Sequence, residues 1–350
     1  MSAVMSASVE QLLQMADDAL RDGEFEDTIA LSKQALEQEP NNTDALELQG
    51  MALGELGEPE ADVVFERLLK LAPKSTTALL GAARVKIVLA GDDRDRIADG
   101  LELLERAEPV AKRDEELSIE LESLRGVAFN KLGDNEDALD SFARVLQLDP
   151  THPEARIEQA VAFFELARFD DAKKAFERIV RDDPQEAWAH HHLGLLAERR
   201  GEDPEPYFAR ARKLAPDEFF APVVLSDDEF RAAVEKAIDE LPEESREAVA
   251  EVPILIEPIP SDDDLADGLS PIILGIFMGA PINDRPMGLD SITPNAMSFE
   301  APRIKLFKKN LERFARTREE IFEEIKITVH HEVGHLLGMD EDELYDRGLD

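Results

Sequence analysis

Along the first two thirds of the chain, apolar positions form amphipathic stretches of helical period, separated at regular intervals by short turns. Successive turns lie 34, 34, 42, 34 and 34 residues apart, and an eight-residue insertion near Glu105–Glu116 accounts for the longer interval. A proline such as Pro40 or Pro150 ends the second stretch of a pair, because proline cannot continue the helical hydrogen-bond ladder. We therefore predict about six helical pairs over residues 8–216. The turns carry Gly23, Gly57, Gly91, Gly133, Ala167 and Gly201.

Beyond residue 216 the repeating pattern stops and a mixed one begins. An apolar stripe from Phe230 to Leu241 predicts a helix that starts at Ser226. Short β-like runs follow at residues 252–260, 271–281 and 303–309, and a last helix is predicted from Thr317 to Gly338. The chain is thus expected to be multidomain: an all-α solenoid over residues 8–216, then a small α/β domain over residues 217–350.

The charge of the chain narrows its class of partner. The 350 residues include 39 Lys and Arg against 78 Asp and Glu, a formal net charge of −39, while 43% hydrophobic residues argue against disorder. Phosphate backbones and anionic lipid repel so acidic a protein, so we expect neither nucleic acid nor a membrane as partner. The N-terminal residues lack a basic segment and a long apolar run, which predicts a cytoplasmic protein.

The absence of cysteine limits any metal site to histidine and carboxylate ligands. His331 and His335 are four residues apart on the last predicted helix, so both face the same side and can hold one zinc ion. Glu332 is placed to accept a proton from a water on the metal and is the candidate catalytic base. Gly338 lets the chain turn, so that Glu341 can fold back as the third ligand.

The repeating part resembles the tetratricopeptide repeat family. The segment GVAFNKLGDNEDALDSFARVLQLDP, residues 126–150, is similar to the family consensus, with Gly126 at a close helix contact and Ala138 and Phe142 at packing positions. The resemblance implies a solenoid that recruits a protein or peptide partner.

The motif HHEVGHLLGMDE in its context resembles the small bacterial minimal-zincin family of metallopeptidase-like proteins. The resemblance covers residues 226–349 and implies one Zn²⁺ per chain and no other cofactor. The family usually has Asp where this chain has Glu341, so Asp340 and Asp342 are alternative third ligands. By analogy with zincins, the strand carrying Arg303, Lys305 and Phe307 is expected to be the edge strand that binds an extended peptide substrate.

These observations favour a zinc metallopeptidase whose tetratricopeptide solenoid brings a substrate or partner to the metal. The alternative is a non-enzymatic adaptor in which zinc only stabilises a short domain. Residues 303–318 hold seven basic side chains and one acidic side chain. They could attract acidic peptides, but we expect them to pair with acidic helices of the chain itself.

Overall fold

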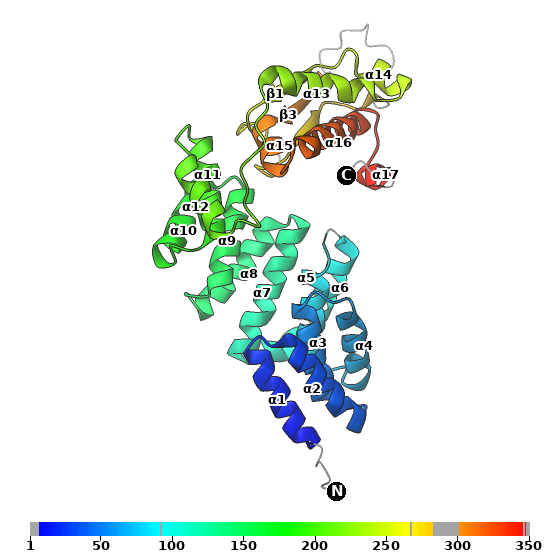
Figure 1. Cartoon of the computed structure of the whole chain (residues 1–350), viewed down its shortest axis with the longest axis vertical. Coiled ribbons are helices and arrows are strands. Elements are labelled where there is room, and N and C mark those ends of the chain that lie inside the picture. Colours follow the sequence, from blue (N-terminus) through cyan, green and yellow to red (C-terminus); the bar gives the residue numbers. More distant parts are fainter. Residues whose placement is uncertain (1–6, 92, 267, 283–300, 346, 348–350) are drawn as a thin grey trace, which may run out of the picture. The chain divides into compact units, whose positions relative to one another are not determined.

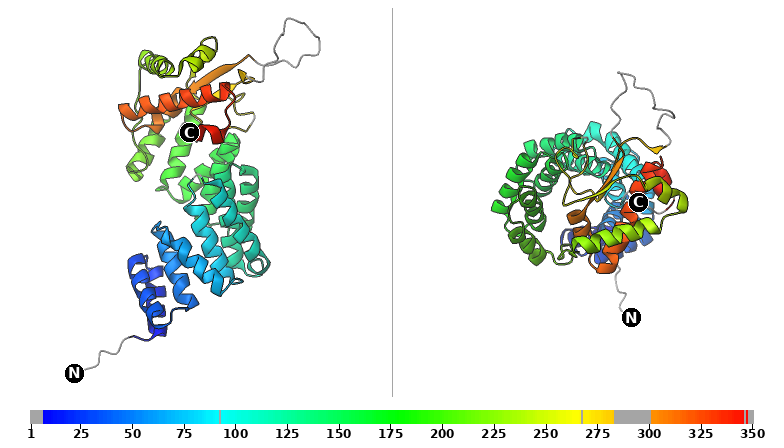
Figure 2. Two further views of the ribbon diagram at one scale, coloured as in Figure 1. Left: turned by 90° about the vertical axis from the view of Figure 1, so that its right-hand side faces the viewer. Right: turned by 90° about the horizontal axis from the view of Figure 1, so that it is seen from above.

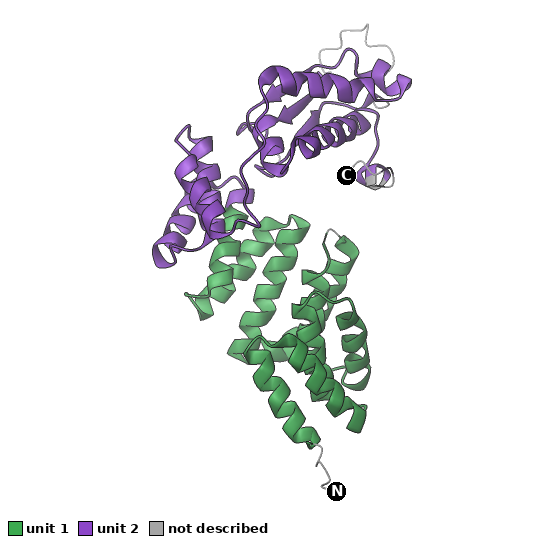
Figure 3. Ribbon diagram, viewed as in Figure 1, with its two compact units in different colours: residues 1–163 green, residues 164–350 purple. Residues whose placement is uncertain are grey.

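The computed structural model describes residues 7–91, 93–266, 268–282, 301–345 and 347, without the side chains of Asp342 and Tyr345. The chain divides into two compact units, residues 1–163 and residues 164–350 (Figure 3). The domain boundary predicted after residue 216 was placed where the repeat pattern ends. It is a different kind of boundary from the division into compact units, and it stays a prediction. Among the described residues, no helix has the length and apolar character that a membrane crossing requires.

The first unit is built from helices that follow one another in antiparallel pairs (Figure 1). The eight-residue insertion is absorbed by α6 and α7, which are 18 residues long each. The helices are α1 (Val9–Arg21), α2 (Phe25–Gln38), α3 (Thr43–Glu55), α4 (Glu60–Leu71), α5 (Thr76–Val88), α6 (Arg94–Ala111), α7 (Glu115–Leu132), α8 (Asn135–Leu148) and most of α9 (Pro153–Glu165).

Small residues let the paired helices approach closely. A Cβ on Gly126 of α7 would lie 2.6 Å from the Phe142 ring of α8, so only glycine fits there. In the turn between the two helices of each pair, one residue has a positive φ. This residue is usually glycine, as at Gly133 (82°), but Ala167 takes the same conformation (54°). The 34-residue period therefore reflects one turn geometry that recurs along the chain.

The second unit begins with the end of α9 and continues with α10 (Phe169–Asp182), α11 (Ala187–Arg199) and α12 (Glu205–Leu214). The histidine run of α11 serves packing. His192 is buried with its ring stacked on Phe176, and His191 is stacked on Phe219.

In the residues that the structure describes, the α/β part of the second unit is a three-stranded sheet with helices around it (Figures 1 and 2). The strand order is β1-β3-β2, with β1 parallel and β2 antiparallel to β3. Helix α16 contacts β2, β3 and α13, and its buried side chains Ile325, Val329 and Val333 belong to the core of this part. The elements are α13 (Asp227–Asp239), α14 (Glu243–Val249), β1 (Ile254–Glu257), β2 (Gly275–Met278), β3 (Arg303–Phe307), α15 (Lys308–Phe314), α16 (Arg318–Leu336) and α17 (Glu341–Tyr345).

Candidate metal centre

Helix α16 places His331 and His335 on one face. The helix starts where predicted, because the Thr317 side chain accepts a hydrogen bond from the backbone N–H of Glu320. Its buried stripe fixes the rotation of the helix against the sheet. Because the two histidines are one helical turn apart on the opposite face, their Nε2 atoms lie 3.0 Å apart.

Glu341 joins the two histidines from the next element. Gly338 has a φ of 83° and turns the chain after α16, so that α17 begins beside the histidine pair. A Glu341 carboxylate oxygen lies 3.4 Å from Nε2 of His335, and the other lies 3.9 Å from Nε2 of His331. Within the described residues, this is the group of three side chains whose ligand atoms lie within 4.8 Å of one another.

The spacing of these donors fits a zinc ion. Two ligands bound at tetrahedral zinc lie about 3.3 Å from each other, close to the three separations found here. Nδ1 of His335 lies 3.2 Å from the carbonyl oxygen of Met339, so Nδ1–H can donate there and leave Nε2 free to bind a metal. Sequence reasoning missed this carbonyl, although the turn at Gly338 was a signal that the chain folds back onto His335.

Glu332 is buried beside the histidines. One of its carboxylate oxygens, Oε2, is buried and has no hydrogen-bond partner, although polar atoms in such positions nearly always have one. Burial raises the pKa of Glu332 to about 8, the Phe277 backbone N–H opposes the rise, and the Glu341 charge adds to it. The strand β2 touches this side chain, since a Cβ on Gly275 would lie 3.0 Å from Oε1 of Glu332.

The alternative third ligands are described only in part. Oδ1 of Asp340 accepts a hydrogen bond from the backbone N–H of Glu343 at 2.9 Å, so Asp340 caps α17. The side chain of Asp342 lies outside the described residues, as does that of Tyr345. Assignment of Glu341 as the third ligand therefore remains a prediction, now supported by its position.

The expectation that Arg303, Lys305 and Phe307 form an edge strand is wrong. β3 is the central strand and pairs with β1 on one side and β2 on the other, so no free backbone edge remains. Phe307 is fully buried, and Nζ of Lys305 is held by Asp264 at 2.8 Å and Glu257 at 3.1 Å. In the described sheet, β2 is the edge strand that contacts α16.

Five basic side chains of the segment 303–318 form ion pairs within the second unit, as expected. Besides Lys305, it contributes ion pairs that join it to α11 and α13. The pairs are Lys308 with Asp227 and Glu312, Lys309 and Arg313 with Glu198, and Arg318 with Glu229. These pairs leave little charge to attract acidic peptides.

Comparison with known families gives a class to both parts of the chain. Residues 249–349 match the zincin-like metallopeptidase family, and residues 13–76 and 130–198 match two tetratricopeptide repeat families. The chain thus contains tetratricopeptide repeats and, over residues 249–349, a zincin-like metallopeptidase domain. No curated protein matches the chain.

Solved structures resemble the repeat part. PilW, described as a widely conserved type IV pilus biogenesis factor, is 19% identical over 59% of this chain and 94% of its own, with a TM-score of 0.52. The tetratricopeptide protein TTC0263 of Thermus thermophilus is 21% identical over 51% of this chain and 93% of its own, with a TM-score of 0.44. The likeness to PilW shows the helical repeat fold.

Proposed function

We propose that this protein is a zinc-dependent peptidase that hydrolyses a peptide bond at the His331, His335 and Glu341 centre. One observation carries the proposal: the buried Glu332 carboxylate has an unpartnered oxygen beside a cluster whose spacing fits zinc. A zinc site that only stabilised the fold would need no such acid. A structural site would also be closed by four protein ligands, whereas the described residues assemble three.

The roles of the side chains follow from their positions. Bound zinc would supply Lewis-acid polarisation of the scissile carbonyl and a lowered pKa of the attacking water. In its ionised form Glu332 would accept the proton of that water at Oε2 and would pass it to the leaving amine. The Phe277 N–H fixes the carboxylate, and the Met339 carbonyl orients the His335 ring. The edge strand β2 offers backbone groups along which an extended peptide can align.

The tetratricopeptide repeats are proposed to bind the protein or peptide that is cleaved, or a partner that delivers it. Two observations support this binding role: the match to tetratricopeptide repeat families and the helical repeat fold of the first unit.

A matched pair of variants tests the catalytic proposal. Glu332→Gln keeps the size of the side chain but cannot accept a proton, so it should retain zinc and lose at least about 100-fold of peptidase activity. The measurement is cleavage of a peptide library by mass spectrometry, with zinc content determined in parallel. If wild type and Glu332→Gln produce the same cleavage products in the same amounts, Glu332 is not the base. A zinc-loaded wild type that cleaves no peptide of the library would favour the structural-zinc adaptor.

A further inference from the structure

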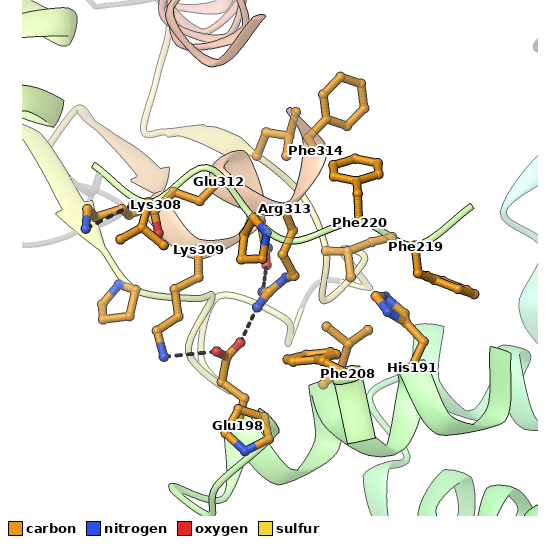
Figure 4. Close-up of a pocket in the computed structure, with 18 of the residues that line it drawn as sticks. His191, Glu198, Phe208, Phe219, Phe220, Lys308, Lys309, Glu312, Arg313 and Phe314 are labelled. Atoms are coloured by element: carbon orange, nitrogen blue, oxygen red, sulfur yellow. Dashed lines mark hydrogen bonds and ion pairs between the residues drawn. The ribbon is translucent and has the colours of Figure 1, made fainter. Parts of the chain in front are cut away.

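A cavity of about 760 Å³ lies inside the second unit, away from the metal centre (Figure 4). Its walls come from the last helical pair, α11 and α12, the segment that leads to α13, and α15 with its neighbouring loops. The volume is within the range of ligand-binding pockets, which is about 300 to 1,000 Å³. Neither the catalytic side chain nor the three candidate ligands line it.

Specific polar contacts fix the cavity walls. Glu198 of α11 binds Lys309, with 3.0 Å between Nζ and Oε1, and also binds Arg313, so it ties α11 to α15 (Figure 4). The Asn310 side-chain amide donates hydrogen bonds to the carbonyls of Pro271 and Ile273, which hold the loop before β2. The cavity is therefore preformed.

Apart from Glu218, the ionic groups that line the cavity form ion pairs with one another or with adjacent residues. Lys308 pairs with Asp227 and Glu312, while Arg212 pairs with Glu205. The floor is uncharged at neutral pH, because burial lowers the pKa of His191 to about 3. A charged ligand would have to displace one of these pairs, so an uncharged ligand is complementary.

The rim exposes large apolar side chains, which is unusual for a site without a partner. Val224 is 67% exposed, Phe314 is 61%, Ile272 is 48% and Trp188 is 47%. These side chains come from α11, α15 and two connecting segments, and all four line the cavity while staying largely exposed. A small molecule inside the cavity would leave them uncovered, whereas a chain segment crossing the mouth would bury them.

We propose that this cavity binds a segment of another protein that carries aromatic or large aliphatic side chains and no net charge. Its large side chains enter the cavity, and the rest of the segment covers Val224, Ile272 and Phe314. One chain segment links the cavity to the metal centre: Leu274 lines the cavity, and the next residue, Gly275, lies against Glu332. That the bound segment belongs to a substrate rests on the proposed function, but the binding itself does not.

The test uses the full chain with Glu332→Gln, so that the probe is not cleaved. The probe is a fluorescein-labelled peptide, Gly-Phe-Ser-Leu-Phe-Ser-Leu-Gly, and binding is measured by fluorescence anisotropy. We expect saturable binding, and at least about tenfold weaker binding when Val224→Ser, Ile272→Ser and Phe314→Ser are combined. The same peptide with both phenylalanines replaced by aspartate should not bind.

A matched control variant carries Val63→Ser, Val88→Ser and Val110→Ser, three similarly exposed side chains of the first unit. It should bind the probe as well as the parent chain does, and zinc content and thermal unfolding should be equal in both variants.

No saturable binding, or equal weakening by both variants, overturns the proposal. Binding of N-acetylphenylalaninamide without binding of the peptide would show a small-molecule site instead. Self-association that only the rim variant abolishes would show that the occupant is a second copy. Absent peptidase activity with intact probe binding would refute the proposed function and leave this site standing.

Discussion

The backbone N–H of Phe277 on β2 donates a hydrogen bond to the Glu332 carboxylate on α16. The candidate base is therefore positioned by the edge strand as well as by its own helix. Two residues before Phe277, Gly275 leaves room for the Glu332 side chain. Strand and helix thus meet at a contact where a single methyl group would matter.

Gly275→Ala should displace Glu332. The added Cβ would lie 2.7 Å from Cγ2 of Thr328 and 3.0 Å from Oε1 of Glu332, closer than atoms in a folded core normally approach. We expect a loss of about 1 to 3 kcal/mol in the free energy of unfolding and at least about tenfold in kcat, with zinc retained. Adding Thr328→Ser removes Cγ2 and should restore part of both. Unchanged kcat in Gly275→Ala would show that β2 does not position the base.

Glu341→Ala should weaken zinc binding more than Asp340→Ala. Glu341 reaches the histidine pair, whereas Asp340 caps α17. Loss of an outer-shell partner costs about 10- to 100-fold in metal affinity, so loss of a ligand should exceed about 100-fold. Competition with a chromophoric chelator measures both affinities. The opposite ranking would make Asp340 the ligand.

Lys305→Met should destabilise the second unit without changing the chemistry. The substitution leaves the Asp264 carboxylate buried without its cation, which costs about 3 to 5 kcal/mol. Asp264→Asn removes the buried carboxylate that has lost its cation. The double variant Lys305→Met with Asp264→Asn should therefore be more stable than Lys305→Met alone. Urea unfolding gives the three values. A kcat/KM that falls further than the folded fraction would instead assign Lys305 to substrate binding.

Residues 217–350 alone should be less stable than residues 164–350. Removing α10 to α12 takes away Glu198, which neutralises Lys309 and Arg313, and Arg199, which donates to the Pro260 carbonyl. We expect the melting temperature to fall by at least about 5 °C. Equal melting temperatures would instead support an independent domain starting at residue 217.

Acid should destabilise the second unit through His192. Burial lowers the pKa of His192 from 6.5 to about 4, and its hydrogen bond to the Trp188 carbonyl opposes the shift. Between these values the unfolded chain takes up a proton that the folded chain does not. The free energy of unfolding therefore has its full value above pH 6.5, and the titration of His192 lowers it by about 3 kcal/mol as the pH drops to 4. Urea unfolding at pH 7 and pH 5 should show a smaller difference for His192→Phe, and an unchanged difference would contradict the assignment.

The sequence was most informative where a local rule governs structure. The spacing of Gly23, Gly57 and Gly133 predicted the helical pairs, and the interval between His331 and His335 predicted a shared helical face. Strand order depends on contacts between residues far apart in the chain, so nothing local to Arg303–Phe307 marked it as the central strand. Ion pairing of the basic segment was expected, but Glu198 could not be named as the partner for the same reason: 115 residues separate Glu198 from Arg313.

The order of strands in the sheet also sets an order in time. β1 and β2 are synthesised first, but in the described sheet each pairs with β3, which leaves the ribosome later. Until β3 emerges, both earlier strands lack their hydrogen-bonding neighbour. The histidines follow β3 in the chain, so a nascent protein acquires its metal ligands only after the strand that completes its sheet. Synthesis that stops before β3 would therefore leave a chain with two unpaired strands and no means of binding zinc at this site.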